Sequence, residues 1–145
     1  MKEALKEAQK AYDIEEVPVG AIIVKDGKII ARAYNTKESK NIATNHAEIL
    51  AIEKACKKLG SWRLLDCDMY VTLEPCAMCT GAILNARIKK LYIGTLDPKT
   101  GACGSMLNLL EDYKFNHKVI VEKNVLQKEC EKILKDFFKH LRSIK

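Results

Sequence analysis

Apolar and polar positions alternate along the chain with two different periods, one typical of helices and one typical of strands. Residues 2–12 carry apolar side chains at helical spacing, which predicts an amphipathic helix. Two short apolar runs follow, at residues 20–24 and 28–31, and each predicts a strand. Between them lies Lys25-Asp26-Gly27, and an Asp-Gly pair favours a tight hairpin turn. The N-terminal part is therefore predicted to be a helix followed by a β-hairpin.

The middle of the chain is predicted to hold two helices separated by a strand. The first helix covers residues 46–59 and is ended by Gly60. Residues 69–73 are rich in strand-forming side chains and run directly into Pro75. Because proline suits the first position of a helix, we expect the second helix over residues 76–85.

Strands and helices keep alternating in the C-terminal part. We expect a strand over residues 90–94, a loop over 95–105 followed by a short helical stretch, and a strand over 117–122. The last helix, over residues 126–144, should bury one face. The apolar residues of that face are Leu126, Cys130, Ile133, Leu134, Phe137, Phe138 and Leu141. Its opposite side is basic, which indicates either an ordinary solvated face or a stripe that approaches phosphates.

The length and composition favour one domain of the α/β class. Strands separated by helices predict an α/β layer with some parallel pairing. No repeat or Pro/Gly-rich linker divides the 145 residues, and we therefore expect a single domain over residues 1–145. The net charge of +6 suggests an anionic partner such as nucleic acid.

Two features bear on the location of the chain. No apolar run approaches the roughly 18 residues of a membrane-spanning helix, so we expect no membrane association. Residues 1–7 alternate charges where a secretory signal would carry an apolar core. The sequence therefore predicts a cytoplasmic protein.

Six cysteines are present, and in a reducing cytoplasm such residues bind metal, react or pack in the core. Cys76 and Cys79 stand three residues apart at the start of a predicted helix. The other four are scattered singly among apolar neighbours and are expected in the core: Cys56, Cys67, Cys103 and Cys130.

Three roles compete for Cys76 and Cys79: metal ligands, a redox pair, or core residues. A helix N-terminus favours thiolate, the form that binds zinc or attacks electrophiles. A structural zinc site needs four protein ligands, and the sequence has no second Cys-x-x-Cys or His-x-x-x-His knuckle. A catalytic zinc site needs three protein ligands and leaves the fourth position open to water, so one more ligand would complete it.

His46 is the best third ligand among His46, His117 and His140, because it opens a predicted helix and is followed by Glu48. Zinc lowers the pKa of its bound water to about 7, and Glu48 would then move protons between this water and the substrate. Positions i and i+2 of a helix do not face each other, which favours one ligand and one proton shuttle. An alternative remains for Glu48, since Asn45-His46-Ala47-Glu48 also resembles a capping box.

Together these residues spell H-x-E, a gap of 26 residues, then P-C-x-x-C, and this pattern matches the signature of zinc-dependent nucleobase deaminases. The wider sequence resembles the bacterial tRNA-specific adenosine deaminase family over nearly its whole length. The resemblance is carried by EVPVGA at 16–21, HAE at 46–48, YVTLEPCAMC at 70–79, DPKTGACGS at 97–105 and FF at 137–138.

The resemblance implies a three-layer cytidine-deaminase-like fold, with a central mixed sheet of about five strands flanked by helices. It also implies a homodimer with one Zn²⁺ and one catalytic water per subunit. The implied reaction is the hydrolytic deamination of adenosine to inosine at wobble position 34 of a tRNA anticodon arm, with release of ammonia.

The resemblance also assigns substrate contacts to four residues. It implies that Asn35 hydrogen-bonds the flipped base and that Val17 lines the base pocket. Asp97 would contact the sugar and backbone beside the target nucleotide, although its other reading is a turn residue before Pro98. Lys99 would neutralise a nearby phosphate.

Two residues depart from the family pattern, and both could alter loop contacts. Tyr34 stands where the family leads us to expect tryptophan, and Cys103 where we expect alanine.

Two other functions remain open at this point. A free nucleobase deaminase, of guanine or cytosine, would use the same zinc site with a closed small-molecule pocket. A zinc-dependent RNA-binding module would keep the fold without catalysis.

Overall fold

The computed structural model describes residues 1–144; Lys145, the last residue of the expected domain, lies outside this range. The elements follow one another as α1 (Lys2–Asp13), β1 (Gly20–Lys25), β2 (Lys28–Tyr34), α2 (Lys37–Lys40), α3 (Ala47–Leu59), β3 (Cys67–Leu73), α4 (Ala77–Asn85), β4 (Lys90–Thr95), β5 (Ile120–Glu122) and α5 (Gln127–Ser143). Helices and strands thus alternate as the hydrophobic pattern predicts.

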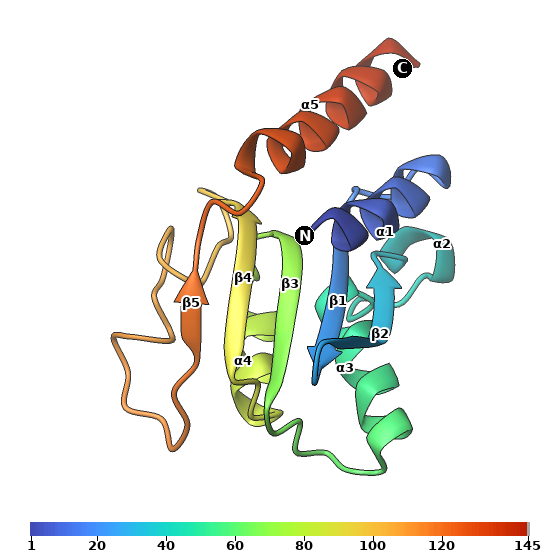
Figure 1. The fold of residues 1–145 in the computed structure, drawn as a ribbon. Helices are drawn as coiled ribbons and strands as arrows, with labels where there is room; N and C mark the ends of the chain where they lie inside the picture. The colour runs from blue at the N-terminus through green and yellow to red at the C-terminus, as the bar shows by residue number, and fades with distance from the viewer. Residues whose placement is uncertain (145) are drawn as a thin grey trace.

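The strands form a single mixed sheet within residues 1–144, in the order β2-β1-β3-β4-β5 (Figure 1). β1 pairs antiparallel with β2 and β3, whereas β3, β4 and β5 run parallel. The connection from β3 to β4 passes through α4, as a parallel pair requires. The mixed sheet of about five strands with flanking helices is confirmed for the described residues.

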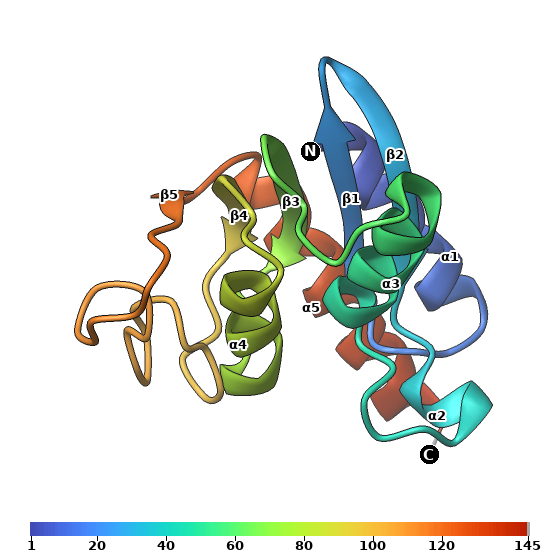
Figure 2. The same ribbon diagram turned by 90° about the horizontal axis from the view of Figure 1, so that it is seen from below.

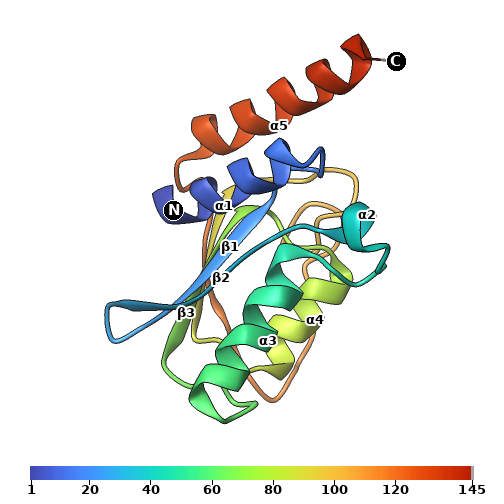
Figure 3. The same ribbon diagram turned by 90° about the vertical axis from the view of Figure 1, so that its right-hand side faces the viewer.

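Helices cover both faces of the sheet and make three layers. α3 and α4 lie side by side on one face, and α1 and α5 lie on the other (Figures 2 and 3). α1 contacts β1, β2 and β3, while α5 makes its main contacts with β4 and α1. None of the helices within residues 1–144 is long and apolar enough to cross a bilayer.

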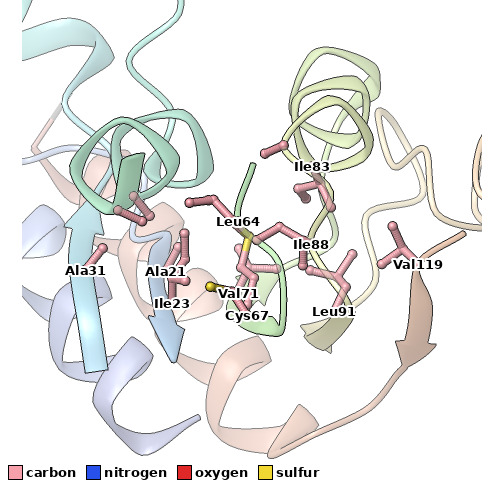
Figure 4. Close-up of a cluster of buried hydrophobic side chains, with 14 of the residues drawn as sticks. Ala21, Ile23, Ala31, Leu64, Cys67, Val71, Ile83, Ile88, Leu91 and Val119 are labelled. Carbon is pink, nitrogen blue, oxygen red and sulfur yellow. The ribbon is translucent and has the colours of Figure 1, made fainter. Parts of the chain in front are cut away.

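The hydrophobic core lies between the sheet and the α3–α4 layer (Figure 4). Alternate strand residues point into it, and Leu64 and Ile88 close it from the connecting segments. Two of the scattered cysteines, Cys67 and Cys103, belong to this core, and Cys56 packs against it half-buried. Cys130 lies on α5 and is buried against Gly94 of β4, so the four scattered cysteines pack as expected.

The hairpin turn has the geometry that its sequence predicts. Lys25 pairs with Lys28, which leaves Asp26 and Gly27 as a two-residue loop. Their φ values of 51° and 75° are both positive, as a type I′ turn requires. Local chemistry therefore sets the pairing next to the turn, and the register shifts further along, between Ile23 and Val24.

The structure departs from the predicted elements at four places. β2 continues three residues further, to Tyr34, and the short helix α2 was not predicted. Residues 106–119 form turns rather than a helical stretch, and an isolated bridge joins Cys103 to Asn108. β5 begins at Ile120, later than predicted, because its parallel partner β4 offers pairing positions only opposite Ile120–Glu122.

The prediction for the apolar face of α5 is only partly right. Within Gln127–Ser143 the buried residues are Cys130 and Phe137, and Phe138 remains 44% exposed. Phe137 packs edge-on against Tyr12 of α1, with ring centroids 5.5 Å apart. The rest of the face stays partly open because α5 crosses only one end of the sheet (Figure 1).

Gly20 allows α1 to lie against β1, because a Cβ at this position would overlap the helix backbone at Ala4 and Ala8. We expect Gly20→Ala to lower the free energy of unfolding by about 1–3 kcal/mol, since backbone cannot move aside as a side chain can. Gly81→Ala is the matched control: Gly81 lies within α4 with open space around it and should gain up to about 1 kcal/mol. Urea titration of both variants measures the difference, and equal stabilities would contradict this account of the α1 contact.

Candidate metal centre and pocket

The site is built where α3 and α4 begin. His46 is the N-cap of α3 and Cys76 the N-cap of α4, both with extended backbone (φ −78° and ψ 152°; φ −73° and ψ 177°). Each helix therefore starts one residue later than predicted. Because α3 and α4 pack side by side, their caps meet at one end of the sheet.

The three sequence-predicted ligands come together at this point. Nδ1 of His46 lies 3.6 Å from Sγ of Cys76 and 3.5 Å from Sγ of Cys79. These three donor atoms all lie within 4.8 Å of one another. A tetrahedral zinc, about 2.05 Å from nitrogen and 2.3 Å from sulfur, would separate such donors by about 3.6 Å. The donor set and its spacing therefore fit zinc.

The other two histidines lie elsewhere. Nε2 of His117 donates to the carbonyl of Ile88 at 2.7 Å, and His140 stacks on Tyr12. In the part of the chain that the structure describes, His46 is the histidine that joins the two thiols.

Of the three donors, Cys76 is the one whose electrostatic surroundings favour a bound cation. A hydrogen bond from Cys79, followed by one from His46, lowers the pKa of the Cys76 thiol to about 4. The same contact raises the pKa of Cys79, which acts as the donor, and contact with Cys76 raises the pKa of His46. Without metal the cluster thus keeps protons that a cation would displace.

Glu48 lies in the first turn of α3 and is 4% exposed. Burial raises the pKa of its carboxyl to about 7, so the group can both hold and release a proton near neutral pH. The capping-box alternative is wrong, because α3 has no side-chain cap and Asn45 donates to Oγ1 of Thr36 instead.

A pocket of about 200 Å³ opens onto two of the three donors, His46 and Cys76, while Cys79 is buried beside them. Pockets for drug-sized molecules measure roughly 300–1,000 Å³, so this one suits a smaller group such as a single planar ring system. Its lining residues are Glu16, Val17, Val19, Asn35, Lys37, Glu38, His46, Ala47, Glu48, Leu73, Glu74, Cys76, Asp97 and Thr100.

Three of the four predicted substrate-contact residues line this pocket, namely Val17, Asn35 and Asp97. Lys99 does not. It lines a neighbouring groove between α5 and the segment after β4, together with Lys135 and Arg142. Lys99 is therefore separated from the three donor atoms but lies beside the basic side of α5.

Asn35 joins two walls of the pocket. Its side chain is 8% exposed, and Nδ2 donates to the carbonyl of Val17 at 3.2 Å. Its Oδ1 accepts from the backbone N–H of Lys37 at 3.1 Å. Composition alone offers no signal for this residue.

Asp97 folds its own loop. Its Oδ1 accepts from the backbone N–H groups of Lys99 and Thr100, and its Oδ2 accepts from Oγ1 of Thr100 at 2.7 Å. The turn role that the sequence allowed is therefore present, and it brings Thr100 to the pocket wall.

Sequence reasoning missed two buried carboxylates in the pocket wall, Glu16 and Glu74. Glu16 accepts from the backbone N–H groups of Glu38 and Ser39 and so holds α2. The available signal was an acidic residue directly beside an apolar run, before Val17 and before Pro75.

The two departures from the family pattern are neither among the three donors nor among the residues that line the pocket. Tyr34 is half-buried at the end of β2, and Cys103 is buried, with its Sγ 3.4 Å from Oγ1 of Thr80.

Comparisons with known proteins give consistent matches. The family model described as MafB19-like deaminase matches residues 1–142. A tRNA-specific adenosine deaminase from Bacillus subtilis (strain 168) is 50% identical over 145 residues, which covers 100% of this chain and 90% of the relative.

Two solved structures share the fold. One comes from a study of A-to-I editing by tRNA:A34 deaminases at the wobble position; it is 45% identical, has a TM-score of 0.89, and covers 92% of this chain and 97% of the other. A guanine deaminase from Bacillus subtilis is 32% identical with a TM-score of 0.64, covering 98% and 90% of the two chains.

Removal of a donor should remove the metal. We expect His46→Ala and Cys76→Ser to lose zinc after dialysis, because two ligands cannot complete a tight site. Cys56→Ser, outside the cluster, and Glu48→Ala should each keep about one zinc per chain. Elemental analysis measures the content, and full occupancy in His46→Ala would remove that residue from the ligand set.

Proposed function

Because the chain belongs to the family of tRNA-specific adenosine deaminases, we propose that it hydrolyses adenosine to inosine at wobble position 34 of a tRNA anticodon arm and releases ammonia. The observation that carries the proposal is the cluster of His46, Cys76 and Cys79 at the edge of a pocket that is lined by His46, Cys76 and the buried Glu48. The deaminase acts as a single domain over residues 1–145.

The metal of this site is zinc, one ion per subunit, held by His46, Cys76 and Cys79. When bound, zinc supplies a Lewis acid that activates the catalytic water at neutral pH. His46 would hold the ion through a neutral imidazole, and Cys76 and Cys79 would hold it through two thiolates. The 3.5 and 3.6 Å nitrogen–sulfur separations support this assignment.

Glu48 is the proton shuttle. It accepts one proton from the attacking water and delivers it to the ring nitrogen of the base, then takes the second proton from the hydroxyl formed on C6 and delivers it to the leaving amine, which departs from C6 as ammonia. The raised pKa of its carboxyl, about 7, suits both directions of transfer. Its burial also keeps bulk water from competing for these protons.

Val17 and Asn35 form the wall that receives the flipped base, and Asp97 faces the adjoining sugar and backbone. Lys99 lies in the next groove with Lys135, Lys139 and Arg142, where a phosphate of the same strand would meet it. An anticodon loop is a favourable target, because its bases are already unpaired and need little energy to extrude.

The two other functions are less well supported. A guanine deaminase is 32% identical to this chain, which keeps a free base as the second candidate, but the A34 deaminase structure is closer in identity and in fold. The basic groove beside the pocket also favours a polymeric substrate over a free base. A binding module without catalysis would have no use for a buried carboxyl beside the metal ligands.

Inosine formation tests the proposal. Zinc-loaded protein should deaminate an anticodon stem-loop with adenosine at position 34 and leave free adenosine, guanine and cytidine unchanged. Glu48→Ala should keep its zinc and lose at least about 100-fold in rate, as expected for loss of a general acid–base group. Turnover of free guanine with no inosine in the stem-loop would move the substrate to the second candidate. Full activity of Glu48→Ala would refute its shuttle role.

We also propose that the protein is a cytoplasmic homodimer. Large apolar side chains, Met78, Met106 and Leu107 among them, are exposed on the isolated chain, and such surface favours an interface. Sedimentation velocity should give a species of twice the chain mass at micromolar concentration, whereas a monomer would contradict the dimer.

The proposed cytoplasmic location is supported by the six unpaired cysteines, which are consistent with a reducing compartment.

A further inference from the structure

The side chain of Glu74 is buried, at 2% exposure, between the end of β3 and the segment of residues 96–105, called here the 96–105 loop. It follows directly after β3 and stands two residues before Cys76. No lysine or arginine pairs with it among the described residues. The buried carboxylate is therefore stabilised by hydrogen-bond donors alone.

All four of these donors come from the 96–105 loop. Oε1 accepts from the backbone N–H of Asp97 at 3.0 Å and from the hydroxyl of Ser105. Oε2 accepts from the backbone N–H groups of Cys103 and Ser105 at 3.0 and 3.1 Å. One carboxylate thus joins the two ends of the loop.

The loop depends on this carboxylate for its shape. It contains no regular helix or strand that could pair its backbone N–H groups, and buried N–H groups need an acceptor. The loop also lies tightly against Glu74, because a Cβ at Gly101 would overlap its carboxyl group. The backbone N–H of Ala102 adds one bond to the carbonyl of Pro75.

The 96–105 loop supplies one wall of the pocket through Asp97 and Thr100. Glu74 is also continuous with the segment that carries Cys76. The carboxylate therefore sets the distance between the metal-ligand segment and this wall.

A carboxylate has about four lone-pair positions, and the four donors occupy them. Glu74 thus has no acceptor left for a metal or for the substrate, although it borders the same pocket as Glu48. Because its acceptors are all occupied, Glu74 differs from a catalytic residue, which would contact the metal or the substrate.

We propose that Glu74 is a positioning residue that holds the Asp97–Thr100 wall in place for substrate binding, an inference that rests on the deaminase function proposed above. Its effect reaches the substrate through the loop, and the zinc ligands and Glu48 keep their places without it.

Glu74→Gln tests this role with little change of size. In this variant an NH2 group replaces one carboxylate oxygen, so a donor stands where an acceptor was. This donor faces the N–H or O–H donors of the loop and repels them. We expect KM for the anticodon stem-loop to rise at least about tenfold, with kcat within about threefold of the parent and one zinc retained per chain. The amides of Asp97, Cys103 and Ser105 should exchange hydrogen at least about tenfold faster, while those of Leu91 and Ile93 in β4 stay protected.

Three further variants keep the test decisive. Gly101→Ala pushes the loop and the Glu74 carboxyl group apart without changing the chemistry of Glu74, and should reproduce the rise in KM. Ser105→Ala removes one of the four donors and should give a smaller change of the same kind, which covers the case in which Glu74→Gln fails to fold. Glu111→Gln removes an exposed carboxylate and should change neither KM nor exchange.

Two results would overturn the proposal. One is a fall in kcat that follows the folded fraction while KM stays constant, which indicates a purely structural role. The other is unchanged exchange of the three loop amides in both Glu74→Gln and Gly101→Ala. If the zinc-loaded parent makes no inosine, the proposed function fails, and the exchange measurement still reports whether Glu74 holds the loop.

Discussion

The meeting of two helix N-termini at one end of the sheet is the constraint on which the site depends. His46 and Cys76 each cap a helix in extended conformation, and the packing of α3 against α4 brings their donor atoms to 3.6 Å. The parallel pairing of β3 with β4 makes α4 start at the carboxyl end of β3, where α/β folds commonly bind ligands. Backbone topology thus determines where the ligands lie, and side chains determine what they bind.

Features with a local cause could be predicted from the sequence. The Asp26-Gly27 turn needs positive φ at two residues, which few residue pairs other than Asp-Gly accept. Gly60 likewise ends α3 in the left-handed conformation. The three metal ligands could also be predicted from the sequence. Paired thiols at the start of a helix are rare, and a histidine with a nearby glutamate restricts the possible chemistry further.

Features that depend on distant partners could not be predicted. Within residues 106–119, Met106 and Leu107 donate to the carbonyl of Gly101, and the side chain of His117 bonds to the carbonyl of Ile88, which is remote in sequence. The apolar face of α5 looked like a core face, yet α5 crosses only the end of the sheet. Asn35 and Glu16 act through backbone groups of other segments, and a one-dimensional pattern does not show such bonds.

The order of the strands has a consequence for the behaviour of the chain at high concentration. β2 and β5 are the outer strands, and exposed strand edges invite edge-to-edge association of molecules. β5 is only three residues long, and the pairing of β1 with β2 shifts register between Ile23 and Val24, which bends the other edge. Arg32 on β2 adds a charge there, tied to Glu3 at 2.8 Å. Both edges are thus poor templates for aggregation, and the sheet can remain open without closing into a barrel.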